Sequence, residues 1–469
     1  MTRAFAAVDL GATSGRVMIG RVGSDVLELE QVARFSNGPV QREDGLHWDF
    51  DTLFEHVLDG LAEAVRREPA IESIGIDAWA VDYGLLRGGK LLAEPFHYRD
   101  DRTARGVEKV HASVPFDELH ARNGLQFLPF NTLYQYAADA RLPDAAMALL
   151  IPDLIAFLLT GAQIAERTNA STTGLLDVRT GDWDRDLAER IGIDPGILPP
   201  LVDAGTVIGR LSPQVAGRVG AELPVVAVGS HDTASAVVAA PLSTADSAYI
   251  SCGTWGLVGL ELDAPVLTDS ARAANFTNEL GVDGRIRFLH NVTGLWLLSE
   301  SVRDWEVEDG APIDLPDLLA QAASVGDALP LFDANDPSLA APGGMPERIA
   351  AALRTSGHPA PESRPALVRT IVDSIAAAFA AAVATAADLT GRPVDAIQLV
   401  GGGSQNELLC QATADRSRLP VLAGPVEATA LGNVLVQARS AGCFPQEAAL
   451  KDLRDLVSRT HRLRRYDPR

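Results

Sequence analysis

Cysteine is scarce in this chain of 469 residues, which has only Cys252, Cys410 and Cys443. An odd number of cysteines at wide spacing forms neither a disulfide framework nor a zinc site. The N-terminal stretch "MTRAFAAVDL" has an apolar segment shorter than the core of a secretion signal. We therefore expect a cytoplasmic protein.

Positive charge and long apolar runs are also in short supply. The chain has 40 Lys and Arg against 62 Asp and Glu, a formal net charge of -22. This balance repels nucleic-acid phosphates and anionic membrane surfaces, so an anionic substrate needs a local basic site or a metal ion. The apolar run 375–387, "IAAAFAAAVATAA", is too short to span a bilayer and predicts a buried helix. We expect a small-molecule substrate and neither nucleic acid nor membrane as a partner.

Two familiar nucleotide motifs are missing. The sequence has no G-x-x-x-x-G-K-[ST], and "GGGSQN" lacks the last glycine of G-x-G-x-x-G. Walker-type NTPases and Rossmann oxidoreductases are therefore disfavoured. Four turns rich in glycine and hydroxyl groups are present instead, each at a predicted strand or helix edge, where α/β folds bind ligands and helix N-termini favour anions. They are "DLGATSG" (9–15), "GSHDTASA" (229–236), "SCGTWG" (251–256) and "VGGGSQNELL" (400–409).

The first of these turns joins two predicted strands in "AAVDLGATSGRVMIGRV", residues 6–22. Ordinary turn chemistry accounts for it, because glycine permits positive φ and Thr and Ser bond to their own backbone. The same residues also suit a phosphate site, with backbone N–H groups on anionic oxygens and Asp9 holding a metal ion. The turn alone leaves both interpretations open.

The order of predicted elements occurs twice. A hairpin, a helix over 50–66 and the strand "IESIGIDAW" are echoed by "AYISCGTWGLVGLEL", a helix over 366–390 and the strand "AIQLVGGG". A repeat of roughly 240 residues is too long for a solenoid and predicts two copies of one α/β fold facing each other across a cleft. Residues 303–365, rich in Pro, Asp and Ala, are expected to form an irregular insertion.

Nine motifs in order give the chain a family resemblance over nearly its whole length. They are "AAVDLGATSGRV", "IGIDAWAVDYGLL", "HYRDDRT", "LIPDLIAFLLTG", "TNASTTGLLD", "GSHDTASAV", "AYISCGTWGLVG", "NVTGLWLL" and "GGGSQNELLCQATAD". In these the chain resembles the FGGY carbohydrate kinases, and within them the rhamnulokinase subgroup. The resemblance implies a duplicated actin-like (ribonuclease H-like) ATPase fold. It also implies transfer of phosphate from ATP, with Mg²⁺, to L-rhamnulose, giving L-rhamnulose 1-phosphate in rhamnose breakdown.

The resemblance also implies domains and sugar-site residues. We expect an N-terminal lobe over 1–238 on the sugar side, a C-terminal lobe over 239–442 on the nucleotide side and a helical tail over 443–469. Asp232 matches the family's proton acceptor, although an Asp before "TASAVV" also suits a helix N-cap. The matching sugar contacts are Ala80, His231, Asp232, Thr233 and Asn291. Ala80 stands where the family commonly has Gly, so its methyl group makes the identity of the sugar less secure.

The nucleotide positions follow from the same resemblance. Asp9 matches a Mg²⁺ position, through water, because Mg²⁺ gives up its hydration shell reluctantly. The matching ATP contacts are Ala12, Thr13, Ser14, Gly15, Arg16, Thr254, Ser299 and Gly402. Ser299 stands where rhamnulokinases often have Gln, so that contact is shorter or water-mediated. Trp255 and Trp296 are assigned to the core.

Three alternatives stay open at this point. The first is a kinase for another ketose, such as L-fuculose, D-xylulose or L-ribulose. The second is an actin-like ATPase that binds protein, and the third is a sugar-binding regulator without catalysis. The last two lack support, since the sequence shows neither an added peptide-binding domain nor a DNA-binding segment. A monomer or a homodimer is expected.

Overall fold

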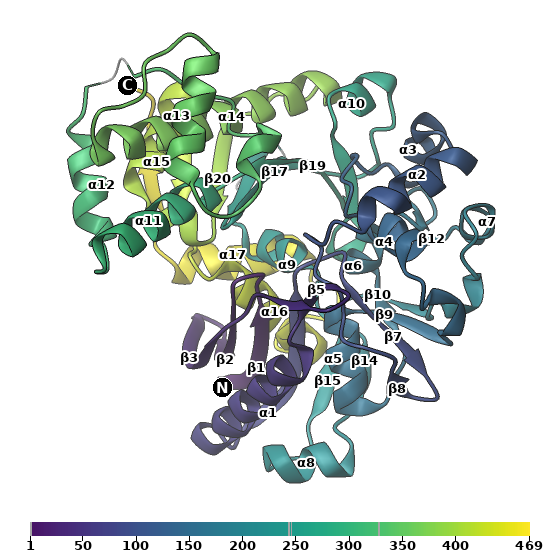
Figure 1. Cartoon of the computed structure of the whole chain (residues 1–469). Coiled ribbons are helices and arrows are strands. Elements are labelled where there is room, and N and C mark those ends of the chain that lie inside the picture. The colour runs from purple at the N-terminus through teal and green to yellow at the C-terminus, as the bar shows by residue number, and fades with distance from the viewer. Residues whose placement is uncertain (1, 243, 245, 327–328) are drawn as a thin grey trace. The chain divides into compact units, whose positions relative to one another are not determined.

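The structure is a computed structural model that describes residues 2–242, 244, 246–326 and 329–469. The chain forms two compact units, each assembled from separate stretches of sequence (Figure 1). The first comprises Met1–Ala239, Glu261–Phe288 and Ala428–Thr460. The second comprises Ala240–Leu260, Leu289–Glu427 and His461–Arg469.

The first unit is built on a six-stranded sheet of order β14-β15-β6-β1-β2-β3. Strand β1 pairs antiparallel with β2 and parallel with β6, so the predicted opening hairpin is confirmed. The strands are β1 (Arg3–Leu10), β2 (Ser14–Gly23), β3 (Val26–Ser36), β6 (Ile71–Ala78), β14 (Val207–Arg210) and β15 (Pro224–Val226).

Helices cover both faces of this sheet. Gly60 of α1 (Phe50–Arg67) lies against Val17, whereas Gly20 lies against Val434 of α16 (Ala428–Ser440). Val17 and Gly20 are three residues apart on β2 and therefore point to opposite faces. The predicted helix over 50–66 is confirmed: its apolar stripe is buried, and burial of each large aliphatic side chain contributes about 1.5–3 kcal/mol.

A long insertion between β6 and β15 carries a second hydrophobic core of the first unit, centred on Tyr83, Leu133, Tyr134 and Leu150. Its largest sheet has the order β8-β7-β9. The strands of the whole insertion are β7 (Tyr83–Arg87), β8 (Lys90–Leu91), β9 (Met147–Leu150), β10 (Ala165–Glu166), β11 (Leu176–Asp177), β12 (Asp182–Trp183) and β13 (Leu201–Val202). The helices are α2 (Thr103–Ser113), α3 (Phe116–Asn123), α4 (Thr132–Ala138), α5 (Ile151–Thr160), α6 (Arg167–Ala170) and α7 (Arg185–Arg190).

The remaining elements of the first unit are short. They are β4 (Pro39–Arg42), β5 (Gly45–Trp48), α8 (Pro213–Val219), α9 (Asp232–Ala239), α10 (Asp269–Ala273) and α17 (Leu450–Thr460). Helix α16 packs on β1, β2, β6 and α9, so a late segment of the chain completes the core around the first hairpin.

The second sheet has the order β18-β19-β17-β16-β20-β21-β22. Strand β16 pairs antiparallel with β17 and parallel with β20, as β1 does with β2 and β6, so the duplicated α/β fold expected from the sequence is confirmed. Strand β18 and the adjoining ends of β17 and β19 belong to the first unit. The strands are β16 (Ser247–Cys252), β17 (Trp255–Leu262), β18 (Thr277–Leu280), β19 (Ile286–Thr293), β20 (Ala396–Val400), β21 (Val421–Ala423) and β22 (Arg464–Tyr466).

Helix α14 (Arg364–Thr390) precedes β20 as α1 precedes β6. By length and composition alone it is apolar enough to cross a membrane, but 67% of its apolar window is buried inside the structure. Val368, Ile371, Ile375 and Phe379 lie at helical spacing and are fully buried. The run 375–387 is therefore a core helix, as the sequence predicted.

The irregular insertion expected over 303–365 is a wrong prediction for much of its length. It holds the end of α11 (Trp296–Asp309) together with α12 (Leu315–Ala323) and α13 (Met345–Thr355). Pro316 and Pro346 lie in the first turns of α12 and α13, where a proline has no helical hydrogen bond to lose. The Asp314 side chain also caps α12 by accepting from Asp317 N at 3.0 Å. The other helix of this unit is α15 (Glu407–Ser417).

Candidate functional site

Three charged side chains meet at one end of the first sheet. Asp9 is paired in register with Arg16 on β2 and with Asp77 on β6. Arg16 Nη2 lies 3.2 Å from Asp9 Oδ2, and Asn433 of α16 donates to Asp77 Oδ2 at 2.6 Å. Burial raises the pKa of Asp77 well above its usual range, and the charge of Asp9 raises it further. This end of the sheet therefore holds two close carboxyl groups with one guanidinium beside them.

The turn of residues 10–15 is held mainly by its own backbone. Gly11 N donates to Ser14 O at 3.0 Å, and Asn37 Nδ2 donates to Gly11 O at 2.8 Å. Neither Gly11 nor Gly15 has a positive φ, so that part of the turn interpretation is wrong. Gly15 is required for space, because a Cβ there would lie 2.1 Å from the Phe35 ring. Thr13 is exposed and Ser14 half-buried.

The turn that carries His231 and Asp232 is docked onto the end of β6. Ala78 N donates to Ser230 O at 2.9 Å, and Ala78 forms a bridge with His231. The buried Glu166 carboxylate accepts from Ser230 N and Ser230 Oγ, both at 3.0 Å. Burial raises the pKa of Glu166, although hydrogen bonds from Thr168 and Ser230 lower it in part. The turn is thus fixed relative to Asp77 from two sides.

Asp232 is the first residue of α9. His231 O accepts from Ala234 N at 2.8 Å and Ser235 N at 3.2 Å, so the chain position of the cap belongs to His231. The Asp232 carboxylate accepts from Thr233 N at 2.6 Å and from Thr233 Oγ1 at 3.2 Å, both at Oδ1. Its side chain is 32% exposed. The N-cap interpretation therefore fits His231 better than Asp232, whose carboxylate still benefits from the helix dipole.

The segment around Ala80 is a strained turn. Asp82 N donates to Ala80 O at 3.0 Å across Val81, whose φ is 71°. A β-branched residue avoids this conformation, so surrounding contacts must impose it. Thr132 Oγ1 and Gln135 Nε2 supply such contacts, donating to Val81 O at 2.8 and 3.2 Å.

Asp82 is the buried anchor of that turn. Oδ2 accepts from Trp48 Nε1 at 2.6 Å, Trp79 Nε1 at 3.1 Å and Tyr98 N at 3.1 Å, while Oδ1 accepts from Gln135 Nε2 at 2.9 Å. Complete burial raises the pKa of Asp82 to about 6, although the hydrogen bonds from Gln135, Trp48 and Trp79 lower it in part. Asp82 stands in the motif "IGIDAWAVDYGLL", and this anchoring was not predicted from the sequence.

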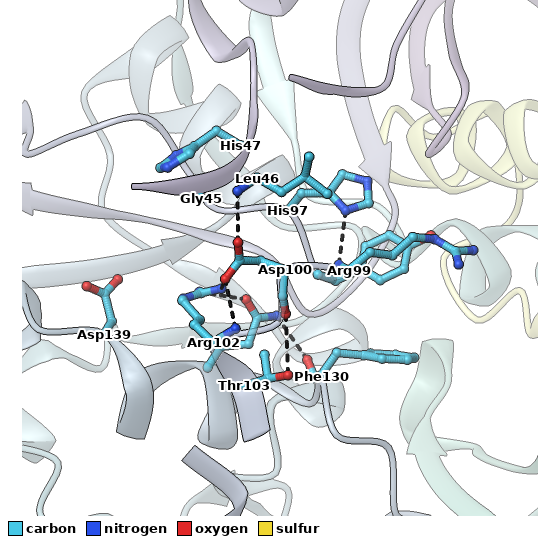
Figure 2. A network of polar contacts seen from close by, with 12 residues as sticks. Gly45, Leu46, His47, His97, Arg99, Asp100, Arg102, Thr103, Phe130 and Asp139 are labelled. Carbon is cyan, nitrogen blue, oxygen red and sulfur yellow. Dashed lines mark hydrogen bonds and ion pairs between the residues drawn. The ribbon is translucent and has the colours of Figure 1, made fainter. Parts of the chain in front are cut away.

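The motif "HYRDDRT" continues the same network (Figure 2). Arg102 Nη2 donates to Gln135 Oε1 at 3.0 Å, and Arg102 N donates to Asp100 Oδ1 at 3.0 Å. Asp100 Oδ2 in turn accepts from Leu46 N at 2.8 Å. Figure 2 shows Asp100 between Leu46 and Arg102. Asp100 and Arg102 therefore support the turn at Ala80 indirectly, because Arg102 binds Gln135 and Gln135 binds the Val81 carbonyl.

In the second unit, the turn of Thr254 is bound to the start of α11. Trp296 N donates to Thr254 O at 3.2 Å, and Leu295 N donates to Gly253 O at 3.0 Å. Ser299 lies one helical turn further and is exposed. Trp255 and Trp296 are only half-buried, so their assignment to the core is wrong.

Gly402 begins a 3₁₀ turn directly after β20. A Cβ at Gly402 would have no atom within 4 Å, whereas one at Gly403 would lie 2.3 Å from Cys252 Sγ. Gly403 is therefore fixed by packing against the Thr254 hairpin, while Gly402 leaves its side open. Asn291 lies on β19 and is half-buried. Thr254, Ser299 and Gly402 thus come together in the second unit, and the charged positions come together in the first.

A site for hydrated Mg²⁺ needs carboxylate groups that can hold the ion through its water molecules. Among the described residues no group of three or more His, Cys, Asp and Glu side chains is placed to hold a metal ion. Mg²⁺ keeps most of its waters and needs only one or two carboxylates together with substrate phosphates. The neighbouring carboxyl groups of Asp9 and Asp77 are suited to that role.

Comparisons with known proteins agree over almost the whole chain. Residues 4–239 match the N-terminal domain, and residues 248–441 the C-terminal domain, of the FGGY family of carbohydrate kinases. The rhamnulokinase of Bacteroides thetaiotaomicron is 38% identical, covering 100% of this chain and 96% of its own. The rhamnulokinase of Klebsiella pneumoniae subsp. pneumoniae is 42% identical, covering 92% of this chain and 88% of its own.

Two solved structures show the same fold at low sequence identity. The xylulose kinase of Lactobacillus acidophilus has a TM-score of 0.80 at 16% identity, covering 100% of this chain and 94% of its own. The glycerol kinase of Plasmodium falciparum, solved with ADP, has a TM-score of 0.76 at 14% identity, with the same coverage.

Proposed function

Because the chain belongs to the FGGY family of carbohydrate kinases, and is therefore a sugar kinase with ATP as its phosphate donor, we propose that its sugar is L-rhamnulose. The product is L-rhamnulose 1-phosphate, an intermediate of rhamnose breakdown. The observation that supports this substrate is the identity of 38–42% to rhamnulokinases along nearly the whole chain. The expected cytoplasmic location agrees with this metabolic role.

Asp232 is the proposed general base. It accepts the proton of the sugar hydroxyl as that oxygen bonds to the γ-phosphorus, and the electron pair of the broken bond leaves with ADP. Transfer of this kind depends chiefly on positioning and on stabilisation of charge. Its side chain is 32% exposed and lies at the start of α9.

The triphosphate contacts are proposed from both hairpins. In the first unit the backbone and hydroxyl groups of Ala12–Arg16 face the phosphates, and Asp9 holds Mg²⁺ through water. Bound Mg²⁺ neutralises charge on the transferring phosphoryl group. In the second unit Thr254 and Ser299 contact the nucleotide, and the open side of Gly402 lets the adenosine approach the backbone.

The sugar contacts are proposed at Ala80, His231, Thr233 and Asn291. The strained turn at Val81 fixes the position of the Ala80 methyl group, because Thr132 and Gln135 hold the Val81 carbonyl. A methyl group held in this way reads the shape of the sugar more strictly than one on a mobile loop. The two lobes at 1–238 and 239–442, the cleft between them and the tail 443–469 remain predictions.

The direct test is release of ADP from Mg-ATP with L-rhamnulose, L-fuculose, D-xylulose, L-ribulose, D-fructose and glycerol, beside a control without sugar. We expect L-rhamnulose to have the highest kcat/KM. A different leading ketose would replace the sugar but keep the kinase. Equal rates with and without sugar would instead favour an ATPase.

A further inference from the structure

A buried ion pair lies directly behind the His231 ring. Glu279 belongs to β18 and Arg287 to β19, and both fall in the first unit. Arg287 Nη2 lies 2.9 Å from Glu279 Oε2 and 2.9 Å from His231 Nδ1. Glu279 Oε2 lies 3.3 Å from the same ring nitrogen. A donor and an acceptor therefore both address His231 Nδ1.

The ion pair is held rigidly and is costly to bury. Arg287 is fully buried, and its Nε donates to Leu280 O at 3.2 Å. Burial raises the pKa of Glu279, but Arg287 and His231 more than offset this and leave the pKa below its ordinary value. Two apolar residues of similar size usually stabilise a core as well as a buried ion pair does, so this pair calls for a role beyond stability.

The donors around the imidazole decide where its protons lie. Arginine has only donors, so Nδ1 accepts from Arg287 and the proton of the neutral ring is on Nε2. If the ring takes a second proton, Nδ1–H donates to Glu279 and Nε2 keeps its proton. Nε2 lies 3.4 Å from Asp232 Oδ1. In both states the nitrogen that faces Asp232 is therefore a donor.

Within the described part of its unit, the polar contacts of the Asp232 carboxylate then all fall on one oxygen. Thr233 N, Thr233 Oγ1 and His231 Nε2 all address Oδ1. Oδ2 is left to meet the substrate. We infer that Arg287 and Glu279 are positioning residues that fix the His231 ring with Nε2–H toward Oδ1, so that Oδ2 of Asp232 receives the sugar proton. This inference rests on the proposed role of Asp232 as general base.

The first experiment replaces Glu279 and uses a matched ion pair as its control. Glu261 and Arg454 form a pair in the same unit, with distances of 2.7 and 2.9 Å, and the side chains of Glu261 and Glu279 are both 9% exposed. We expect Glu279→Gln to lower kcat by about 10- to 100-fold, the range for an outer partner that fixes a histidine, with KM for ATP unchanged. Glu261→Gln should keep kcat even where it lowers the melting temperature.

The second experiment tests whether Glu279 acts through His231. In a double-mutant cycle with His231→Gln, whose amide nitrogen replaces Nε2–H, adding Glu279→Gln should lower kcat no further. The ¹⁵N shifts of His231 should report Nε2–H in the unaltered enzyme. In Glu279→Gln they should report a mixture of tautomers, because Arg287 loses the partner that holds its donor at Nδ1. Arg287→Lys gives a second route if Glu279→Gln does not fold, and it should lower kcat in the same way.

The outcomes separate this inference from the function on which it rests. Wild-type kcat in folded Glu279→Gln and Arg287→Lys, an unchanged tautomer, or effects that multiply with His231→Gln would each overturn the inference. If Asp232→Asn keeps full kinase activity, or the unaltered protein shows no activity dependent on sugar, the proposed function fails instead.

Discussion

The two hairpins of the duplicated fold have the same pattern of strand pairing and very different side chains. Asp9 and Ser251 are both the second-last residue of the first strand of their hairpin. Asp9 is flanked in register by Arg16 and Asp77, whereas Ser251 is flanked by Leu257 and Val400. The first copy, with Asp9, therefore has charged side chains at this end of its sheet, and the second copy, with Ser251, has neutral ones.

This difference separates scaffold from chemistry. In both sheets an antiparallel hairpin is followed by two parallel strands and closed by an antiparallel edge strand. The repeated order supplies backbone turns that can face phosphate in either copy. The proposed base, metal position and sugar contacts belong mostly to the charged copy, while the nucleotide contacts proposed at Thr254 and Gly402 lie in the other copy and carry no charge.

The sharpest test of the charged copy is Asp232→Asn. The amide keeps the shape of the side chain but cannot take the sugar proton, so kcat should fall by about 10²- to 10⁴-fold. Affinity for ADP, measured by calorimetry, should stay within about twofold if only the proton transfer is lost. Normal turnover in this variant would remove Asp232 from the mechanism.

A second test compares the two equivalent strand positions directly. Asp9→Asn removes a carboxylate from the proposed Mg²⁺ position and should lower kcat/KM by about 10²-fold, with a higher Mg²⁺ concentration needed for half-maximal rate. Ser251→Ala, at the same place in the neutral hairpin, should change kcat/KM by less than about threefold. Similar losses in both variants would contradict the division between the copies.

The third test concerns how the buried carboxyl group of Asp82 makes the free energy of unfolding depend on pH. Because the pKa of Asp82 is raised to about 6 in the folded protein, its contribution to stability is fully present below the unfolded value and is lost as pH rises through 6. The loss amounts to about 2 kcal/mol between pH 4 and pH 7. Urea unfolding at both pH values should show this dependence, and Asp82→Asn should reduce it. An unchanged pH profile in Asp82→Asn would assign the dependence to other groups.

The smallest effect is expected on the neutral side of the comparison. Ser299 is exposed on α11, so Ser299→Gln adds a longer amide where there is room for it. A single hydrogen bond of about 0.5–1.5 kcal/mol predicts a KM for ATP that is lower by about two- to tenfold, with kcat unchanged. A higher KM would show that the serine is itself the better fit.

The regular elements were largely predictable from the sequence, since their patterns are local. The alternation of the first hairpin and the helical spacing over 50–66 and 366–390 gave the correct elements within a few residues. Helices α12 and α13 were missed because proline and aspartate were interpreted as breakers, although both residues also start helices. Local composition does not decide between these two uses.

The residues of the candidate site were likewise predictable where their sequence pattern is local and not predictable where it is not. The turns of Asp9, Asp232, Thr254 and Gly402 were found because glycine and hydroxyl residues cluster at strand ends. Glu279 and Arg287 were missed, since they are isolated charges in apolar strands whose partner His231 is about fifty residues away, and only the fold brings them together. The anchoring of Val81 by Thr132 and Gln135 was hidden for the same reason.

The late position of α16 in the chain has a consequence for synthesis. Asn433 and Gln437 of this helix hydrogen-bond to Asp77, Ser73 and the backbone of Ala6, which are among the first residues to leave the ribosome. The hydrogen bonds from Asn433 and Gln437 to this end of the sheet can therefore form only after most of the chain has been translated. During synthesis the first hairpin and β6 therefore leave the ribosome long before the helix whose amide side chains hold Asp77 and Ser73 in place.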